Sequence, residues 1–147
     1  MDLTNLLNNI PYSSKNVIVF DIDGTLINNN KKLNTKTFEF YYYCLYKKYK
    51  IYIITSRQGT DRNVDYTVTE LDELGIENYD KIFFTNPKNN IQNLQDAMKY
   101  KQYVRKYIQD LGYNITLSIG DQDSDYGKYG GIGIKVINNG EKFVRMV

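Results

Sequence analysis

Two carboxylates, Asp21 and Asp23, stand one residue apart directly after the apolar run 17–20, and Gly24 follows them. Carboxylates are almost never fully buried unless they are paired or bind a metal. A second acidic string, at 121–125, follows another apolar run far along the chain. Because ligands of open α/β sheets bind beyond the carboxyl ends of the strands, the two strings predict one divalent metal held between two strand ends.

Two further positions carry groups that suit the same chemistry. Thr55 and Arg57 follow the apolar run 51–54, and Lys101 lies near the start of a predicted helix. Carboxylates suit Mg²⁺, which keeps several waters and accepts phosphate oxygens from a substrate. A carboxylate is also a nucleophile in phosphoryl transfer, where catalysis is mainly positioning and electrostatic stabilisation. We therefore expect Lys101, Thr55 and the backbone amides near Gly24 to stabilise a transferring phosphoryl group.

The strands that must position these groups are visible as short apolar runs. These runs alternate with helical periodicities, which is typical of a parallel sheet with helices on both faces. In such a sheet all the reactive groups would gather at one edge. We therefore expect an α/β fold of three layers, with about five strands over 17–20, 51–54, 81–85, 115–119 and 132–137.

Three helices are expected to connect these strands. The first runs from Asn34 or Thr35 to about Tyr49, and its aromatic residues recur at helical spacing as a core stripe. The second and third are expected to stop at Gly75 and Gly112. Residues 1–15 are predicted to form a lead-in segment with one weak helical turn, and 16–147 a single domain.

Composition excludes several classes of chemistry. The chain has 147 residues, a formal net charge of +2 and no histidine, which removes His-ligated zinc and Ser-His-Asp triads. Its single cysteine, Cys44, permits no intrachain disulfide and is expected to be a small core residue. The N-terminus does not read as a signal peptide, and no run approaches membrane-spanning length. We therefore expect a soluble cytoplasmic protein that does not associate with membranes.

The reactive positions resemble, in order, the four motifs of the haloacid dehalogenase (HAD) superfamily. These are Asp21-Ile22-Asp23-Gly24-Thr25-Leu26, then Ile53-Ile54-Thr55-Ser56-Arg57, then Lys101, and then Gly120-Asp121 through Asp125. Three stretches are more specific and resemble the acid phosphatases of HAD subfamily IIIB, the group related to plant vegetative storage proteins. They are Tyr100-Lys101-Gln102-Tyr103-Val104-Arg105, then Gly112-Tyr113-Asn114-Ile115, and then Gly120-Asp121-Gln122-Asp123-Ser124-Asp125. The resemblance implies a HAD-like, Rossmann-type fold.

The resemblance also implies catalytic and metal-binding roles. Asp21 would be the nucleophile and a Mg²⁺ ligand. Asp23 would protonate the leaving oxygen and then activate water, and its backbone carbonyl would touch the metal. Thr55 would hydrogen-bond the phosphoryl group, and Lys101 would neutralise charge between the phosphate and the nucleophile. Asp121 would hold Mg²⁺ directly or through water.

Supporting roles are implied for a further set of positions, namely Asp125, Gly24, Ser56, Arg57 and Arg105. Ser56 departs from the pattern, because the family usually has glycine there. The stretch between the first two motifs is short, and the predicted helix fills it. No large cap domain fits, so we expect an open site.

These features favour a Mg²⁺-dependent phosphomonoester hydrolase that acts on phosphorylated small molecules through an aspartyl-phosphate. One alternative is a nucleotide or polynucleotide phosphatase, although the small net charge does not favour nucleic acid. Another is a non-catalytic binding or storage protein on the same fold. The fifteen tyrosines suit a homodimer face as well as a tyrosine-rich core.

Overall fold

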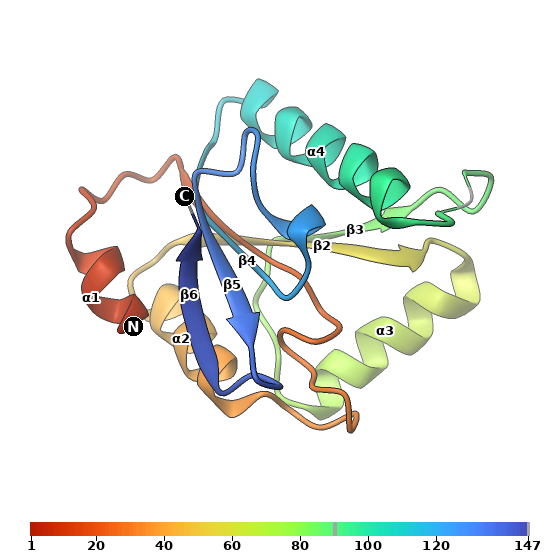
Figure 1. Cartoon of the computed structure of the whole chain (residues 1–147), viewed down its shortest axis with the longest axis horizontal. Coiled ribbons are helices and arrows are strands. Elements are labelled where there is room, and N and C mark those ends of the chain that lie inside the picture. The colour runs from red at the N-terminus through yellow and green to blue at the C-terminus, as the bar shows by residue number, and fades with distance from the viewer. Residues whose placement is uncertain (90, 147) are drawn as a thin grey trace.

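The computed structural model describes residues 1–89 and 91–146, and Figure 1 shows one twisted sheet with helices on both faces. The sheet has six strands in the order β3-β2-β1-β4-β5-β6. All neighbouring strands are parallel except β5 and β6, which form an antiparallel pair. The strands are β1 (Asn16–Phe20), β2 (Lys50–Gln58), β3 (Lys81–Thr85), β4 (Asn114–Gly120), β5 (Ile132–Ile137) and β6 (Lys142–Met146).

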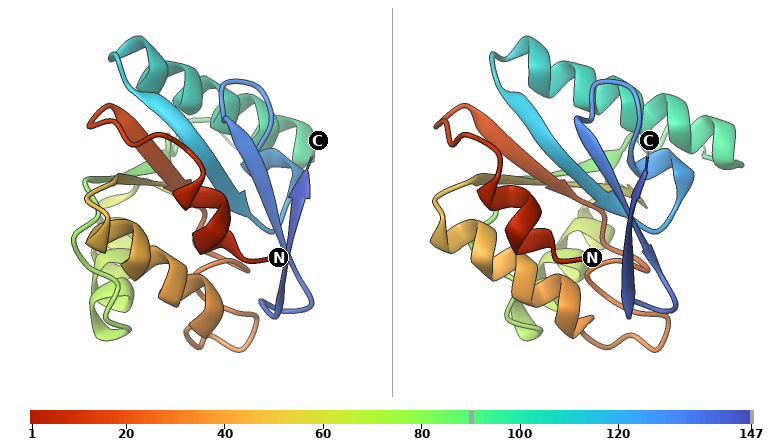
Figure 2. Two further views of the ribbon diagram at one scale, coloured as in Figure 1. Left: turned by 90° about the vertical axis from the view of Figure 1, so that its left-hand side faces the viewer. Right: turned by 60° about the vertical axis from the view of Figure 1, so that its left-hand side comes forward.

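Helices cover the two faces of the sheet unequally. The helices are α1 (Leu3–Asn8), α2 (Thr35–Tyr46), α3 (Asp61–Glu73) and α4 (Leu94–Asp110), and η1 (Asp123–Asp125) is a short 3₁₀ turn. In Figures 1 and 2, α4 lies on one face, whereas α1, α2 and α3 lie on the other. None of the helices in the described residues is long and apolar enough to cross a membrane.

The central strand β1 is apolar throughout because both of its faces are covered. Ile18 and Phe20 point into a core shared with α1, α2 and α3. Val17 and Val19 point into a second core, which contains Val104 and Ile108 of α4. A strand buried on both faces reads as a continuous apolar run, which is why the sequence predicted β1.

The structure extends the predicted lead-in segment into a packed helix. Asp2 caps α1 by accepting hydrogen bonds from the backbone amides of Thr4 and Asn5. Leu3 and Leu7 on this helix are buried in the same core as α2. Burial of two leucines contributes a few kcal/mol, so the segment is attached firmly to the sheet.

Helix α2 ends earlier than expected, at Tyr46 rather than about Tyr49. Lys48 adopts a positive φ of 68°, and the amide of Tyr49 donates to the carbonyl of Cys44. This closing turn resembles a Schellman motif formed without glycine, and it returns Tyr49 to the core. Cys44 is buried, as the sequence predicted.

The sixth strand is the main feature that the sequence analysis missed. Strand β6 pairs with β5 at the sheet edge, and it mixes the charged residues Lys142 and Arg145 with three apolar residues. A short, half-exposed strand lacks the continuous apolar run by which the central strands were recognised. Its omission leaves the arrangement of the central strands unchanged.

Candidate active site

The carboxyl ends of β1 and β4 lie side by side, and this juxtaposition brings the two acidic strings together. The amide of Asp21 donates to the carbonyl of Ile119, which continues the pairing of β1 with β4. Gly24 has a positive φ of 78°, and a Cβ on it would overlap the carboxylate of Asp121. Glycine is therefore required here for both backbone conformation and close approach.

Three carboxylates converge beyond these strand ends. Each of Asp21, Asp121 and Asp125 offers an oxygen, and the three oxygens lie within 4.8 Å of one another. Asp21 and Asp125 are buried, and Asp121 is partly exposed. Such crowding of like charges is unfavourable unless cations offset it. Among the described residues these three groups form a cluster that could hold a metal ion.

Lys101 is the cation that the protein itself places among these carboxylates. It projects from α4, its Nζ lies 2.8 Å from Asp21 Oδ1, and it also forms an ion pair with Asp125. Only 4% of its side chain is exposed. Burial disfavours the charged amine, but the charges of Asp21 and Asp125 outweigh this effect and raise the pKa of Lys101 above its usual value. The lysine is therefore charged at neutral pH.

The raised pKa values of Asp121 and Asp125 indicate that Lys101 does not fully compensate the negative charge of the cluster. Burial and then the charge of Asp21 raise the pKa of Asp121 to about 6. Burial and Asp21 also raise the pKa of Asp125, against the opposing effect of Lys101. The buried Oδ1 of Asp121 has no hydrogen-bond partner among the described residues. An all-oxygen donor set with one unpartnered oxygen fits a hard cation such as Mg²⁺.

The second predicted motif ends β2 beside this cluster. Thr55 is buried, and its Oγ1 accepts a hydrogen bond from the amide of Arg57 at 3.1 Å. Ser56 is exposed and lines the cavity above Asp21. The predicted contact between Thr55 and a phosphoryl group stays a prediction.

Arg57 contacts Asp23 rather than standing free in the cavity. Its Nε lies 3.0 Å from Asp23 Oδ2, and its Nη2 lies 2.7 Å from Asp23 Oδ1. Partial burial favours the neutral acid, but the hydrogen bonds and charge of Arg57 outweigh it and lower the pKa of Asp23. Asp23 is therefore held as a carboxylate, the form that accepts a proton.

Sequence analysis missed the two residues of α3 that hold Arg57. The Nη1 of Arg57 donates to Thr67 Oγ1 at 3.0 Å and to Glu70 Oε1 at 2.8 Å. Thr67 is fully buried, and both residues face β2. Their spacing of three places them on one side of the helix, next to the apolar stripe. The available signal in the sequence was the position of these two polar residues beside the apolar stripe of the predicted helix.

Arg105, which was predicted as a pocket residue, lies behind the acidic loop. It is buried, and its guanidinium donates to the backbone carbonyls of Ser124, Tyr126 and Lys128. The three guanidinium nitrogens therefore point toward the loop, and Arg105 does not line the cavity at Asp21. The helical spacing placed it correctly one turn after Lys101 but could not show which groups it contacts.

Asp21, Asp23 and Asp121 line a cavity of about 500 Å³. Several polar side chains that sequence analysis did not select also line it, namely Asn29, Gln92, Asn93, Gln122 and Ser124. Its polar lining suits a charged ligand better than an apolar one.

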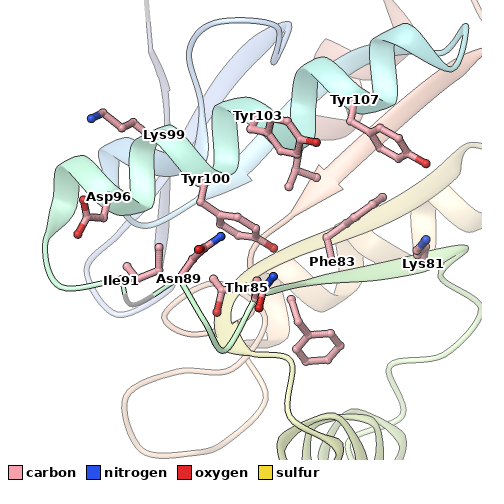
Figure 3. A pocket seen from close by; sticks show the side chains of 13 residues that line it. Lys81, Phe83, Thr85, Asn89, Ile91, Asp96, Lys99, Tyr100, Tyr103 and Tyr107 are labelled. Carbon is pink, nitrogen blue, oxygen red and sulfur yellow. The ribbon is translucent and has the colours of Figure 1, made fainter.

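A larger cavity of about 760 Å³ lies elsewhere, between β3 and α4. Figure 3 shows Tyr100, Tyr103 and Tyr107 on the helix facing Phe83 and Thr85 on the strand. Asp96 is the acidic residue in its lining, and the carboxylate cluster is not part of it. The candidate active site is therefore the smaller cavity, where the reactive groups converge.

Comparison with known proteins identifies the class to which this fold and site belong. The family described as HAD superfamily, subfamily IIIB (Acid phosphatase) matches residues 6–145. The chain therefore belongs to this family, and the resemblance noted in its motifs is confirmed. Among proteins with curated descriptions, none matches the chain significantly.

A solved structure shares the fold. It is a class C acid phosphatase from Bacillus anthracis with tungstate bound, and it is 21% identical in sequence with a TM-score of 0.59. The match covers 84% of this chain and 58% of that chain. The protein thus spans little more than half the length of this relative. The similarity confirms the predicted HAD-like α/β fold.

Proposed function

We propose that this protein is a Mg²⁺-dependent phosphomonoester hydrolase that forms an aspartyl-phosphate on Asp21. The observation that carries this proposal is the position of Asp21 at the end of β1. It is bonded to Lys101 and adjacent to Asp121 and Asp125. Family membership supports phosphatase chemistry. The Bacillus anthracis relative has tungstate bound, and tungstate resembles phosphate in being a tetrahedral oxyanion.

The same carboxylates would hold the metal. Side-chain oxygens of Asp21 and Asp121 and the backbone carbonyl of Asp23 would bind Mg²⁺, with Asp125 in support. The unpartnered Oδ1 of Asp121 agrees with this assignment. When bound, Mg²⁺ would offset the negative charge of the carboxylates and of the phosphate.

In the first half-reaction, a carboxylate oxygen of Asp21 attacks the phosphorus. The bond from phosphorus to the leaving oxygen breaks, and Asp23 donates a proton to that oxygen. Asp23 must carry a proton for this step, whereas Arg57 favours its ionised form. A phosphate dianion bound next to Asp23 would counteract the charge of Arg57 and raise the pKa of Asp23 again. Lys101 would stabilise the charge that develops between Asp21 and the phosphoryl oxygens.

In the second half-reaction, the ion pair with Arg57 favours the required state. Asp23 as a carboxylate accepts a proton from water, and the water oxygen attacks the phosphorus of the aspartyl-phosphate. The bond between phosphorus and the Asp21 oxygen breaks, which releases inorganic phosphate and restores the free carboxylate. Arg57 would keep the base aimed at the cavity and ionised.

The proposal is tested by hydrolysis of p-nitrophenyl phosphate by wild type and Asp21→Asn, with and without Mg²⁺. We expect Mg²⁺-dependent turnover that falls by at least about 10³-fold in the variant, because the amide cannot replace the nucleophile. Asp110→Asn is a matched control, since Asp110 is exposed and pairs only with Lys106 among the described residues. Turnover by Asp21→Asn at the wild-type rate would refute the mechanism.

A substrate panel separates the proposal from the nucleotide and polynucleotide alternatives. The same preparation would be given p-nitrophenyl phosphate, a mononucleotide and a 3′-phosphorylated oligonucleotide. If kcat/KM were highest for the oligonucleotide, the result would favour a polynucleotide phosphatase. Metal binding without hydrolysis of any of the three would favour a binding or storage protein.

A further inference from the structure

One buried arginine of α4 contacts the backbone of the acidic loop that follows β4. The Nε of Arg105 donates to the carbonyl of Lys128 at 3.0 Å, and Nη1 donates to that of Ser124 at 2.9 Å. Nη2 makes a longer bond of 3.4 Å to the carbonyl of Tyr126. Arg105 is only 2% exposed, so these carbonyls have replaced the water around its charge. The guanidinium thus spans the loop over residues 124–128.

Lys101 stands one helical turn before Arg105, on the same side of α4. It binds Asp125, which lies next to Ser124 in the loop. The helix therefore contacts the loop twice, once through a carboxylate and once through the backbone. The loop's other bonds include a local turn from Gln122 to Asp125 and a hydrogen bond from Ser118 Oγ to the carbonyl of Gly130.

Arg105 also contributes a charge that no carboxylate neutralises directly. Among the described residues it forms no ion pair, and its hydrogen-bond acceptors are neutral carbonyls. An arginine remains protonated even when it is buried. The cluster of three carboxylates therefore has two buried cations nearby, Lys101 within it and Arg105 behind it. A second positive charge reduces the repulsion that would otherwise push Asp125 and Asp121 away from Asp21.

We propose that Arg105 is a positioning residue that holds Asp121 and Asp125 next to Asp21 before a metal binds. This inference rests on the metal site of the proposed function. Arg105 touches neither the substrate cavity nor the metal-binding oxygens, and it acts through the backbone of the loop. Mutation of groups that orient metal ligands typically lowers metal affinity or activity by roughly 10- to 100-fold.

The test compares Arg105→Met and Arg105→Lys with a matched control, Ser118→Ala. The control removes a buried hydrogen bond from the far end of the same loop and leaves the charge unchanged. Two quantities would be measured for each variant. The first is the Mg²⁺ dissociation constant by calorimetry, and the second is amide hydrogen exchange over residues 121–128 in EDTA.

We expect Arg105→Met to weaken Mg²⁺ binding by about 10- to 100-fold and to speed loop exchange in the metal-free protein. Arg105→Lys keeps the charge but not the three-way contact, so it should recover part of the affinity. Ser118→Ala should change the Mg²⁺ dissociation constant by less than about twofold, because it does not act on the carboxylates. If Arg105→Met does not fold, Arg105→Lys with weakened binding and faster exchange would support the proposal.

Several outcomes would overturn the proposal. One is an Arg105 variant with wild-type Mg²⁺ affinity and wild-type loop exchange. Another is a loss of Mg²⁺ affinity in Ser118→Ala that equals the loss in Arg105→Met, because general destabilisation would then explain both. Failure of the proposed function gives a different pattern, in which wild type binds Mg²⁺ but hydrolyses no phosphomonoester. If wild type bound no Mg²⁺, unchanged loop exchange in Arg105→Met would still refute the positioning role.

Discussion

Replacing Lys101 by methionine should destabilise the metal-free protein severely at neutral pH. The substitution keeps an apolar chain of similar length but leaves Asp21 and Asp125 buried without their cation. At 2.8 Å and an effective dielectric constant of 20, one such contact corresponds to about 6 kcal/mol of Coulomb energy. Desolvation of the lysine offsets part of this, and removal of one partner from a buried ion pair costs about 3–5 kcal/mol.

The loss should depend on pH in a defined direction. Burial and the charge of Asp21 already raise the pKa of Asp125, and without Lys101 this folded-state pKa rises further above its unfolded value. Groups with raised pKa values contribute stability at low pH, and this stability is lost as pH rises through the folded pKa. The destabilisation measured at pH 8 should therefore shrink by at least about half at pH 5, where Asp125 is protonated in the variant.

Urea denaturation of wild type and Lys101→Met in EDTA, at pH 5 and pH 8, measures these free energies. Lys106→Met is a matched control on the same helix. It removes an exposed pair with Asp110 at 2.9 Å and should leave the free energy of unfolding nearly unchanged at both pH values. A loss below about 1 kcal/mol for Lys101→Met at pH 8 would refute the reasoning that the pair is buried and essential.

Two further predictions follow from the other charged groups. Because the pKa values of Asp121 and Asp125 are raised, the metal-free protein loses stability as pH rises from about 4 to 7. The increase in Tm that Mg²⁺ produces should therefore be larger at pH 8 than at pH 5. An equal increase at both pH values would contradict a metal site made of these carboxylates. Arg57→Met should raise the pKa of Asp23 and move the acidic limb of the pH–kcat profile upward by about one unit. Arg145→Met, at an exposed position, is the control, and an unmoved limb in Arg57→Met would exclude Asp23 as the titrating base.

Much of this arrangement was predictable because the strands β1, β2 and β4 are buried. Burial on both faces makes β1 and the first part of β2 continuous apolar runs, whereas β4 interleaves apolar residues with the small buried Thr116 and Ser118. In each case reactive side chains follow the apolar residues. Strand β6 was not predicted because it lies at an edge, where solvent permits the exposed charged residues Lys142 and Arg145. Helix α2 was predicted too long because Lys48 closes it in a conformation usually taken by glycine.

The partners of the arginines could not be derived from spacing. A motif places Arg57 and Arg105 near the site, but a long side chain reaches several groups. Thr67 and Glu70 hold one guanidinium toward Asp23, and three loop carbonyls hold the other. These contacts join segments that are distant in the sequence, so only the folded arrangement defines them.

The order of the strands has a consequence for synthesis of the chain. β1 pairs with β4, and Asn16 and Asn114, which face each other across that pairing, are 98 positions apart. At typical rates of translation, β1 waits roughly 5–20 s for this neighbour to be made. During that interval its apolar residues are exposed on at least one side, where they offer a nascent chain an edge for aggregation. Chaperone dependence and slow refolding are therefore expected of this protein, and the edge that carries the carboxylate cluster assembles only after β4 has been synthesised.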